Sequence, residues 1–149
     1  MPDATPEFKQ RLREALAQME PGQTFEFSRT FTEGDLSAFC GVTGDYNPYH
    51  MDDRFARESW YGQRTIPGLL TASMMTHIGG MLGFLATDMA FEFVSPVYPG
   101  DTITCTVTIE EKDGEKRHVR ARASFVNGDG TEVLRARFGG FPGNIRLAR

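Results

Sequence analysis

Residues 68–86, GLLTASMMTHIGGMLGFLA, contain most of the longest apolar stretch of the chain. Threonine, serine, histidine and glycine residues interrupt this stretch, which predicts a buried helix rather than a membrane span. Its apolar residues lie nearly all round the helix, as is typical of a helix that other structure encloses. We therefore expect this segment to form the central hydrophobic helix of the fold.

Four β-strands are predicted after this helix, three from alternating apolar and polar residues and TITCTVTIEE from its β-branched and aliphatic residues. Asp-Gly pairs at 113–114 and 129–130 separate the last three strands and indicate hairpin turns. The four strands are DMAFEFVSPV (88–97), TITCTVTIEE (102–111), RHVRARASFVN (117–127) and EVLRARFGGF (132–141), and a further strand, QTFEFSRTF (23–31), precedes the helix. We expect an antiparallel meander and an α+β fold, in which a curved antiparallel sheet wraps around the central helix.

The chain length suits a single domain. Its 149 residues contain no repeat or linker that would divide them. We expect one domain over residues 1–149, with an N-terminal covering helix at about 6–19, where Phe8, Leu12 and Met19 share a helical face. The chain is 40% hydrophobic and 24% charged, which is typical of a globular protein and not of a disordered one.

The charge balance limits the partners. A formal net charge of −4 argues against nucleic acid as a partner, because phosphate binding needs concentrated positive charge. A basic cluster does occur in the second half of the chain, and it is either a solvated strand face or a surface that attracts the phosphates of a nucleotide-bearing ligand. The cluster consists of Lys112, Lys116, Arg117, Arg120 and Arg122.

The cysteine pattern indicates the compartment. Cys40 and Cys105 are far apart and form no CxxC motif, so we expect buried thiols and neither a metal site nor a disulfide framework. The sequence indicates no cofactor. The first ten residues, MPDATPEFKQ, contain no apolar signal segment. We expect a soluble protein of the cytoplasm with no membrane partner.

Residues 44–50, GDYNPYH, place a carboxylate and a histidine in a tight turn. Because the residue before a proline is disfavoured in the helical region, Asn47-Pro48 predicts an irregular loop that brings Asp45 and His50 together. A carboxylate beside a neutral imidazole can hold and activate a water molecule. The pair is a candidate acid–base site, although loops of this composition also serve purely structural roles.

Two helix starts flank this loop. Thr32 followed by Asp35 predicts the start of a short helix through Cys40, because a hydroxyl and a carboxylate there satisfy free amide groups. Carboxylates at the start of DDRFARESW (52–60) suit the N-terminal end of a second short helix.

Gly68 stands at the start of the central helix, directly after Pro67. Free N–H groups at a helix start can stabilise a developing oxyanion. A proline also suits a helix boundary, since its missing N–H is not needed there. The same two residues are therefore compatible with a simple helix boundary.

Three motifs in order resemble one known family. GDYNPYH followed by MDDRFA, then YGQRTIPGLLTAS, then FEFVSPVYPGDTI, resemble the MaoC-like dehydratases, which comprise (R)-specific enoyl-CoA hydratases and related acyl dehydratases with a hot-dog fold. The pattern of that family is GDxNPxHxDxxxA, a glycine-led helix ending in a phrase like LLTAS, and FxxPVxxGDT. The resemblance covers residues from about 30 to 140.

The resemblance implies roles for individual residues. Asp45 and His50 match the catalytic pair that deprotonates a water for addition to C3 of a trans-2-enoyl thioester, and Asn47 matches an asparagine that braces the loop. Gly68 matches the glycine whose N–H holds the thioester carbonyl. Thr76 falls where some hydratases have a serine near the substrate.

The resemblance also implies partners. It predicts an acyl thioester substrate, carried by coenzyme A or acyl carrier protein, and a homodimer with the acyl tunnel at the interface. Many family members have a histidine before the glycine, where this chain has Pro67. We expect activity to survive this difference, because the proposed donor is the backbone of Gly68.

The leading hypothesis is (R)-specific hydration of trans-2-enoyl thioesters, or the reverse dehydration of (R)-3-hydroxyacyl thioesters. A thioesterase and a non-catalytic acyl-thioester-binding protein are the alternatives. We expect His77 to be a core histidine and His118 to lie on the surface. Trp60 and Tyr61 either gate a pocket or fill a surface groove. The methionines either line an acyl tunnel or pack in the core; they are Met74, Met75, Met81 and Met89.

Overall fold

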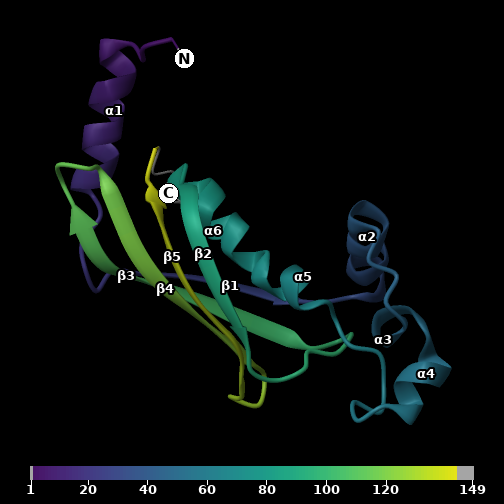
Figure 1. Cartoon of the computed structure of the whole chain (residues 1–149). Helices are drawn as coiled ribbons and strands as arrows, with labels where there is room; N and C mark the ends of the chain where they lie inside the picture. Colours follow the sequence, from purple (N-terminus) through teal and green to yellow (C-terminus); the bar gives the residue numbers. More distant parts are fainter. Residues whose placement is uncertain (1, 144–149) are drawn as a thin grey trace.

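The computed structural model describes residues 2–143, which form a five-stranded antiparallel sheet and six helices (Figure 1). The predicted α+β class and curved antiparallel sheet are confirmed. The strands are β1 (Thr24–Thr30), β2 (Leu85–Phe93), β3 (Thr102–Asp113), β4 (His118–Asn127) and β5 (Glu132–Phe141). The order across the sheet is β1-β3-β4-β5-β2.

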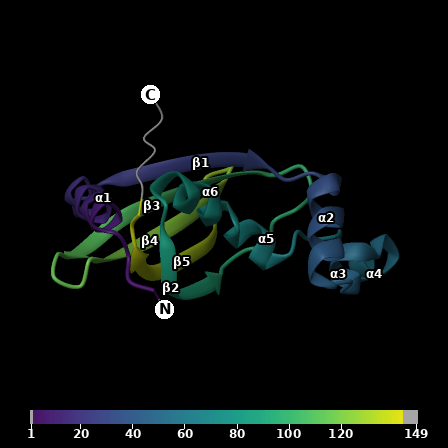
Figure 2. The ribbon, with the colours of Figure 1, turned by 90° about the horizontal axis from the view of Figure 1, so that it is seen from above.

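Some helices lie over the sheet, and the others lie at its two ends. They are α1 (Pro6–Ala17), α2 (Glu33–Thr43), α3 (Pro48–Met51), α4 (Asp53–Glu58), α5 (Gly68–Ala72) and α6 (Met74–Leu82). Figure 2 shows α6 over the sheet, α1 at one end, and α2, α3 and α4 gathered beyond the other end. No helix within residues 2–143 combines the length and apolar character needed to cross a membrane.

The predicted meander is correct for three strands and wrong for the fourth. β3, β4 and β5 pair in sequence order through the two Asp-Gly turns, whereas β2 pairs with β5 at the sheet edge, with Phe91 opposite Ala136. Alternation indicates a strand and its buried face, but it carries no information on which strand lies beside it. The segment after β2 therefore crosses to β3 instead of forming a hairpin with it.

The core lies between α5–α6 and the concave face of the sheet. Full burial of one large aliphatic or aromatic side chain contributes about 1.5–3 kcal/mol, so this cluster is the main source of stability. Its largest fully buried members include Ile78 of α6 and Phe125 of β4. The predicted buried thiols are confirmed at Cys40 and Cys105, and burial raises the pKa of Cys105 to about 12.

The central helix differs from the prediction in three respects. It ends at Leu82, so Leu85 and Ala86, which were expected in the helix, lie in β2. It divides at Ser73, whose hydroxyl donates to the Leu70 carbonyl (2.6 Å) and so competes with the helical bonding pattern.

The central helix is also not enclosed on all sides. His77 is exposed and stacks on Phe27 of β1, with ring centroids 3.9 Å apart, so the predicted core histidine is wrong. Because the sequence neighbours of His77 are mostly apolar, the sequence did not indicate that this side of the helix is exposed.

The predicted start of α2 is confirmed by a capping box. The Thr32 N–H donates to Asp35 Oδ2 (2.9 Å), and the Asp35 N–H donates to Thr32 Oγ1 (3.2 Å). The pKa of Asp35 lies below its usual range, mainly because the Thr32 backbone N–H donates a hydrogen bond to the carboxylate. This cap matters for function because α2 leads directly into the candidate loop.

We expect Thr32→Ala to lower the free energy of unfolding by about 1 kcal/mol, because it removes the hydroxyl of the cap. Thr32→Ser keeps the hydroxyl and is the matched control.

The folded pKa of Asp35 lies below its unfolded value of about 3.9, so the stabilisation that Asp35 provides is complete above that pH and is lost as the pH falls through the folded pKa. Asp35→Asn should therefore weaken the acid dependence of stability in urea titrations, and an unchanged dependence would contradict this assignment.

Candidate active site

The end of α2 delivers Asp45 to the site. Gly44 adopts a left-handed conformation (φ 74°) that favours glycine, and its N–H donates to the Cys40 carbonyl, which ends the helix. The Asp45 N–H donates to Thr43 Oγ1 (3.2 Å). The carboxylate is partly exposed, and its Oδ1 accepts from the Asn47 N–H (3.3 Å). The loop is thus held by local hydrogen bonds on both sides of Asp45.

His50 lies on α3 and not in an irregular loop, so the prediction was wrong for the second half of residues 44–50. The side chain of Asn47 accepts from the Tyr49 N–H (3.2 Å) and caps the helix, and Pro48 occupies its first position. Asparagine at the N-cap followed by proline is itself a helix-start signal, which was available in the sequence.

The Asp45 and His50 side chains face each other. His50 Nε2 lies 3.8 Å from Asp45 Oδ2, and the two side chains are 13% and 43% exposed, respectively. The other ring nitrogen, Nδ1, lies 2.7 Å from the Thr65 carbonyl oxygen. Because a carbonyl can only accept, Nδ1 carries the hydrogen in the neutral ring, and Nε2 presents its lone pair toward Asp45. The separation of 3.8 Å exceeds a direct hydrogen bond and permits a bridging water.

Both side chains line a cavity of about 720 Å³. This volume falls within the range of about 300–1,000 Å³ that is typical of small-molecule sites. Its walls come from the Asp45 loop, residues 65–69, residues 93–97 and the start of β5. They are mainly apolar, with Asp45, Asn47 and His50 as convergent polar groups. Such a cavity can hold an apolar chain and present one end of it to the acid–base pair.

Gly68 lies on the same cavity, at the first residue of α5. Its N–H has no intrahelical acceptor at this position, and Pro67, the N-cap residue, offers no side-chain hydrogen bond. A Cβ at residue 68 would lie 2.5 Å from Phe93 Cε1, so any larger residue there would displace the exposed Phe93 ring. The structure therefore brings Asp45, Asn47, His50 and Gly68 together around one cavity.

Thr76 lies outside this cavity. It is exposed on α6, where its hydroxyl donates to the Ser73 carbonyl (2.7 Å), and it lines a separate cavity of about 280 Å³. Met75 and Met89 line that second cavity too. The substrate role of Thr76 stays a prediction.

The two aromatic residues, His118 and the basic cluster lie in different surroundings. Tyr61 lines the main cavity, whereas Trp60 is 96% exposed in a neighbouring surface groove. His118 on β4 is partly buried. Most of the basic cluster is paired on the strand surface, which favours the solvated-face interpretation; the pairs are Lys112–Glu20, Lys116–Asp113, Arg120–Asp88 and Arg122–Glu110.

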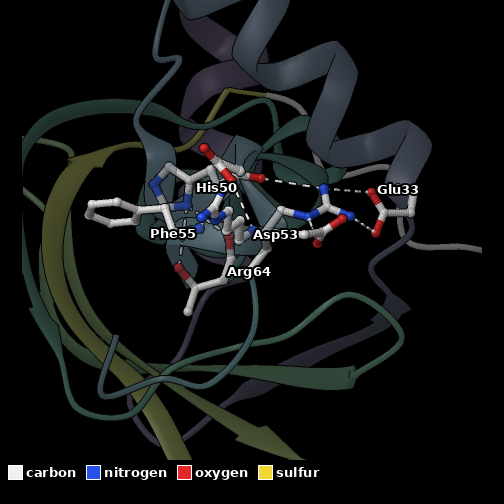
Figure 3. A network of polar contacts seen from close by, with 8 residues as sticks. Glu33, His50, Asp53, Phe55 and Arg64 are labelled. Carbon is white, nitrogen blue, oxygen red and sulfur yellow. Dashed lines mark hydrogen bonds and ion pairs between the residues drawn. The ribbon is translucent and has the colours of Figure 1, made fainter. Parts of the chain in front are cut away.

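Arg64 is one of the polar residues near the site that the sequence did not indicate, and Thr65 is another. The Nε of Arg64 donates to Asp53 (2.6 Å), and Nη1 and Nη2 donate to the two carboxylate oxygens of Glu33 (3.0 and 2.7 Å), as Figure 3 shows. The hydrogen bond to Asp53, followed by that to Glu33, raises the pKa of Arg64. Glu33 lies 31 residues away in sequence, and no local pattern signals such a contact.

Comparison with known proteins supports the same family as the motifs. A family profile described as MaoC like domain matches residues 16–128. The (R)-specific enoyl-CoA hydratase of Rhodospirillum rubrum is 28% identical over 130 residues, which are 80% of this chain and 90% of that protein. The 3-hydroxybutyryl-CoA dehydratase of Methylorubrum extorquens is 29% identical over 115 residues, which are 74% and 73% of the two chains.

Solved structures show the same fold. The unliganded R-hydratase PhaJ1 from Pseudomonas aeruginosa has a TM-score of 0.80 at 25% identity and covers 90% of this chain and 91% of its own. The (R)-hydratase from Aeromonas caviae has a TM-score of 0.80 at 23% identity and covers 84% and 98%. The predicted hot-dog fold is thereby confirmed. Since the profile spans most of the sequence, this chain belongs to the MaoC-like domain family of hydratases and dehydratases.

Proposed function

We propose that this chain catalyses (R)-specific hydration of trans-2-enoyl thioesters, or the reverse dehydration of (R)-3-hydroxyacyl thioesters. The observation that carries the proposal is the contact between His50 Nδ1 and the Thr65 carbonyl, which leaves the lone pair of Nε2 facing Asp45 at the cavity wall. The named activities of the Rhodospirillum and Methylorubrum relatives support the same reaction class.

In the hydration direction, a water between Asp45 Oδ2 and His50 Nε2 loses a proton to the pair as its oxygen bonds to C3. The electron pair of the C2–C3 double bond moves toward the thioester oxygen, which becomes enolate-like. The Gly68 N–H donates to that oxygen and stabilises its charge. The pair then returns the proton to C2, so that both parts of the water end on the substrate. Dehydration follows the same steps in reverse.

The remaining residues support this arrangement. Asn47 caps α3 and so holds His50 relative to Asp45. The apolar walls at residues 93–97 suit the acyl chain, and the carrier is coenzyme A or acyl carrier protein. The homodimer stays a prediction of the resemblance. The exposed Leu85 and Phe93 on the edge strand β2 are compatible with a second copy there.

Purified protein should bleach the conjugated-thioester absorbance of crotonyl-CoA without releasing free thiol, because hydration leaves the thioester intact. Chiral analysis of the product should give the (R)-3-hydroxyacyl thioester. Release of thiol to a thiol-reactive dye would favour a thioesterase instead. Thermal stabilisation by enoyl-CoA without turnover at any chain length would contradict the proposal and favour a binding protein.

A further inference from the structure

The segment at residues 64–65 is joined to His50 and its neighbour by several contacts. The Thr65 N–H donates to the Tyr49 carbonyl (3.0 Å), and the Thr65 carbonyl accepts from His50 Nδ1 (2.7 Å). Thr65 Oγ1 lies 3.3 Å from the same ring nitrogen. Arg64 Nη1 donates to the His50 carbonyl (3.4 Å). The position of Thr65 thus determines which acceptor meets the imidazole.

Two carboxylates hold the Arg64 guanidinium from the other side (Figure 3). Glu33, the first residue of α2, accepts through both oxygens, and Asp53, the first residue of α4, accepts from Nε. Arg64 is 19% exposed, whereas Glu33 and Asp53 are 61% and 65% exposed. One side chain therefore connects the helices that precede and follow the segment from Asp45 to His50.

Few side chains in this part of the chain are fully buried, although Tyr49 packs edge-to-face against Phe55 and Tyr61 (ring centroids 4.9 and 5.7 Å apart). α3 has no buried residue, and α4 has only Ala56. These helices lie beyond the end of the sheet, away from the main core (Figure 2). Polar contacts therefore contribute to the position of His50, and a planar guanidinium with donors on several sides is suited to that task.

We propose that Arg64 is a positioning residue for His50: it anchors residues 64–65 to α2 and α4, keeps the Thr65 carbonyl against Nδ1, and thereby keeps the lone pair on Nε2. The catalytic consequence rests on the proposed function of His50, but the effect on the imidazole does not. The hydrogen bond made by one ring nitrogen of a histidine determines which tautomer is present.

If the ion pairs of Arg64 were purely structural, loss of Arg64 would leave kcat unchanged. Pairs with exposed carboxylates contribute little to stability, so loss of Arg64 should change the unfolding transition only slightly. Loss of positioning should instead lower kcat by roughly 10-fold or more, toward the 10²-fold that a displacement of about 1 Å can cause. KM should change little, because the binding walls remain. Arg64→Lys should recover part of kcat, since lysine keeps the charge without the planar fork.

The tautomer of His50 can be observed directly by ¹⁵N NMR of the imidazoles, because the chain has only three histidines. At a pH where the ring is neutral and without substrate, His50 should carry its hydrogen on Nδ1. Arg64→Met, which keeps an unbranched side chain, should move a measurable share of His50 to the Nε2–H form. Arg120→Met is the matched control, because Arg120 also makes a two-point contact with one carboxylate, that of Asp88 on β2 (3.3 and 2.9 Å). Neither Arg120 nor Asp88 lines the main cavity.

If Arg64→Met does not fold, the double variant Glu33→Ala and Asp53→Ala removes both exposed acceptors of Arg64 and gives the same test. A folded variant of either kind that keeps His50 fully in the Nδ1–H form would overturn the proposal, whatever its kcat. This reading is independent of turnover. If the wild-type protein hydrates no enoyl thioester, the proposed function fails, while the NMR spectra still decide the role of Arg64.

Discussion

Replacing Asp45 with asparagine should lower kcat for crotonyl-CoA hydration by about 10²–10⁴-fold, the usual contribution of one acid–base group. The asparagine amide has nearly the same shape and keeps an oxygen that can accept from the Asn47 N–H, but it cannot take a proton. Asp45 is 43% exposed, so the fold should be unaffected. Initial rates and thermal unfolding of the same preparation measure the two effects separately.

Asp129→Asn is the matched control for this change. Asp129 is an exposed carboxylate in the turn between β4 and β5, and Asn-Gly suits such a turn as well as Asp-Gly does. We expect its rate to equal that of the wild type. Because Asp45 and His50 act on the same proton, the double variant Asp45→Asn and His50→Gln should be little slower than the slower single variant. Effects that multiply, or an unchanged rate in Asp45→Asn, would contradict the assigned pair.

Removing the N–H at residue 68 should lower kcat by about 10²–10³-fold, as the loss of one oxyanion donor does in other enzymes. Gly68→Pro removes this N–H at a position where proline fits the first turn of a helix. Pro67 has ψ of 134°, an extended conformation that a following proline requires. Any side chain at residue 68 meets the Phe93 ring, so Phe93→Ala should be present in every variant compared.

Gly68→Ala in the Phe93→Ala background is the control, because it adds a Cβ and keeps the N–H. We expect it to retain the kcat of Phe93→Ala alone, whereas Gly68→Pro in the same background should show the full loss. Steady-state rates across crotonyl-CoA concentrations separate kcat from KM. Equal rates for the alanine and proline variants would exclude the Gly68 N–H as the donor.

The strands and helix starts of this fold could be predicted from the sequence because their signals are local. Alternation located four of the five strands, β-branched and aliphatic composition located β3, and Thr32 with Asp35 marked the start of α2. The position of β2 beside β5 was missed because strand pairing depends on residues far apart. The open face of α6 at His77 was missed for a similar reason, since residue type alone does not show which side of an apolar helix other structure covers.

The site divides in the same way. Asp45, Asn47 and His50 lie within one turn, so their proximity follows from sequence spacing, and Gly68 was identified by its helix start. Arg64 gave no signal, because its carboxylate partners are 31 and 11 residues away. The sequence also could not predict which ring nitrogen of His50 carries the hydrogen, since this depends on the Thr65 backbone carbonyl and not on a side chain.

A crystal structure of the Asp45→Asn variant with crotonyl-CoA bound tests the central claim most directly. We predict that the thioester oxygen lies about 3 Å from the Gly68 nitrogen, within hydrogen-bond distance. C3 of the enoyl group should face a water held between residues 45 and 50. A thioester oxygen bound away from Gly68, or a C3 that points away from His50, would contradict the mechanism.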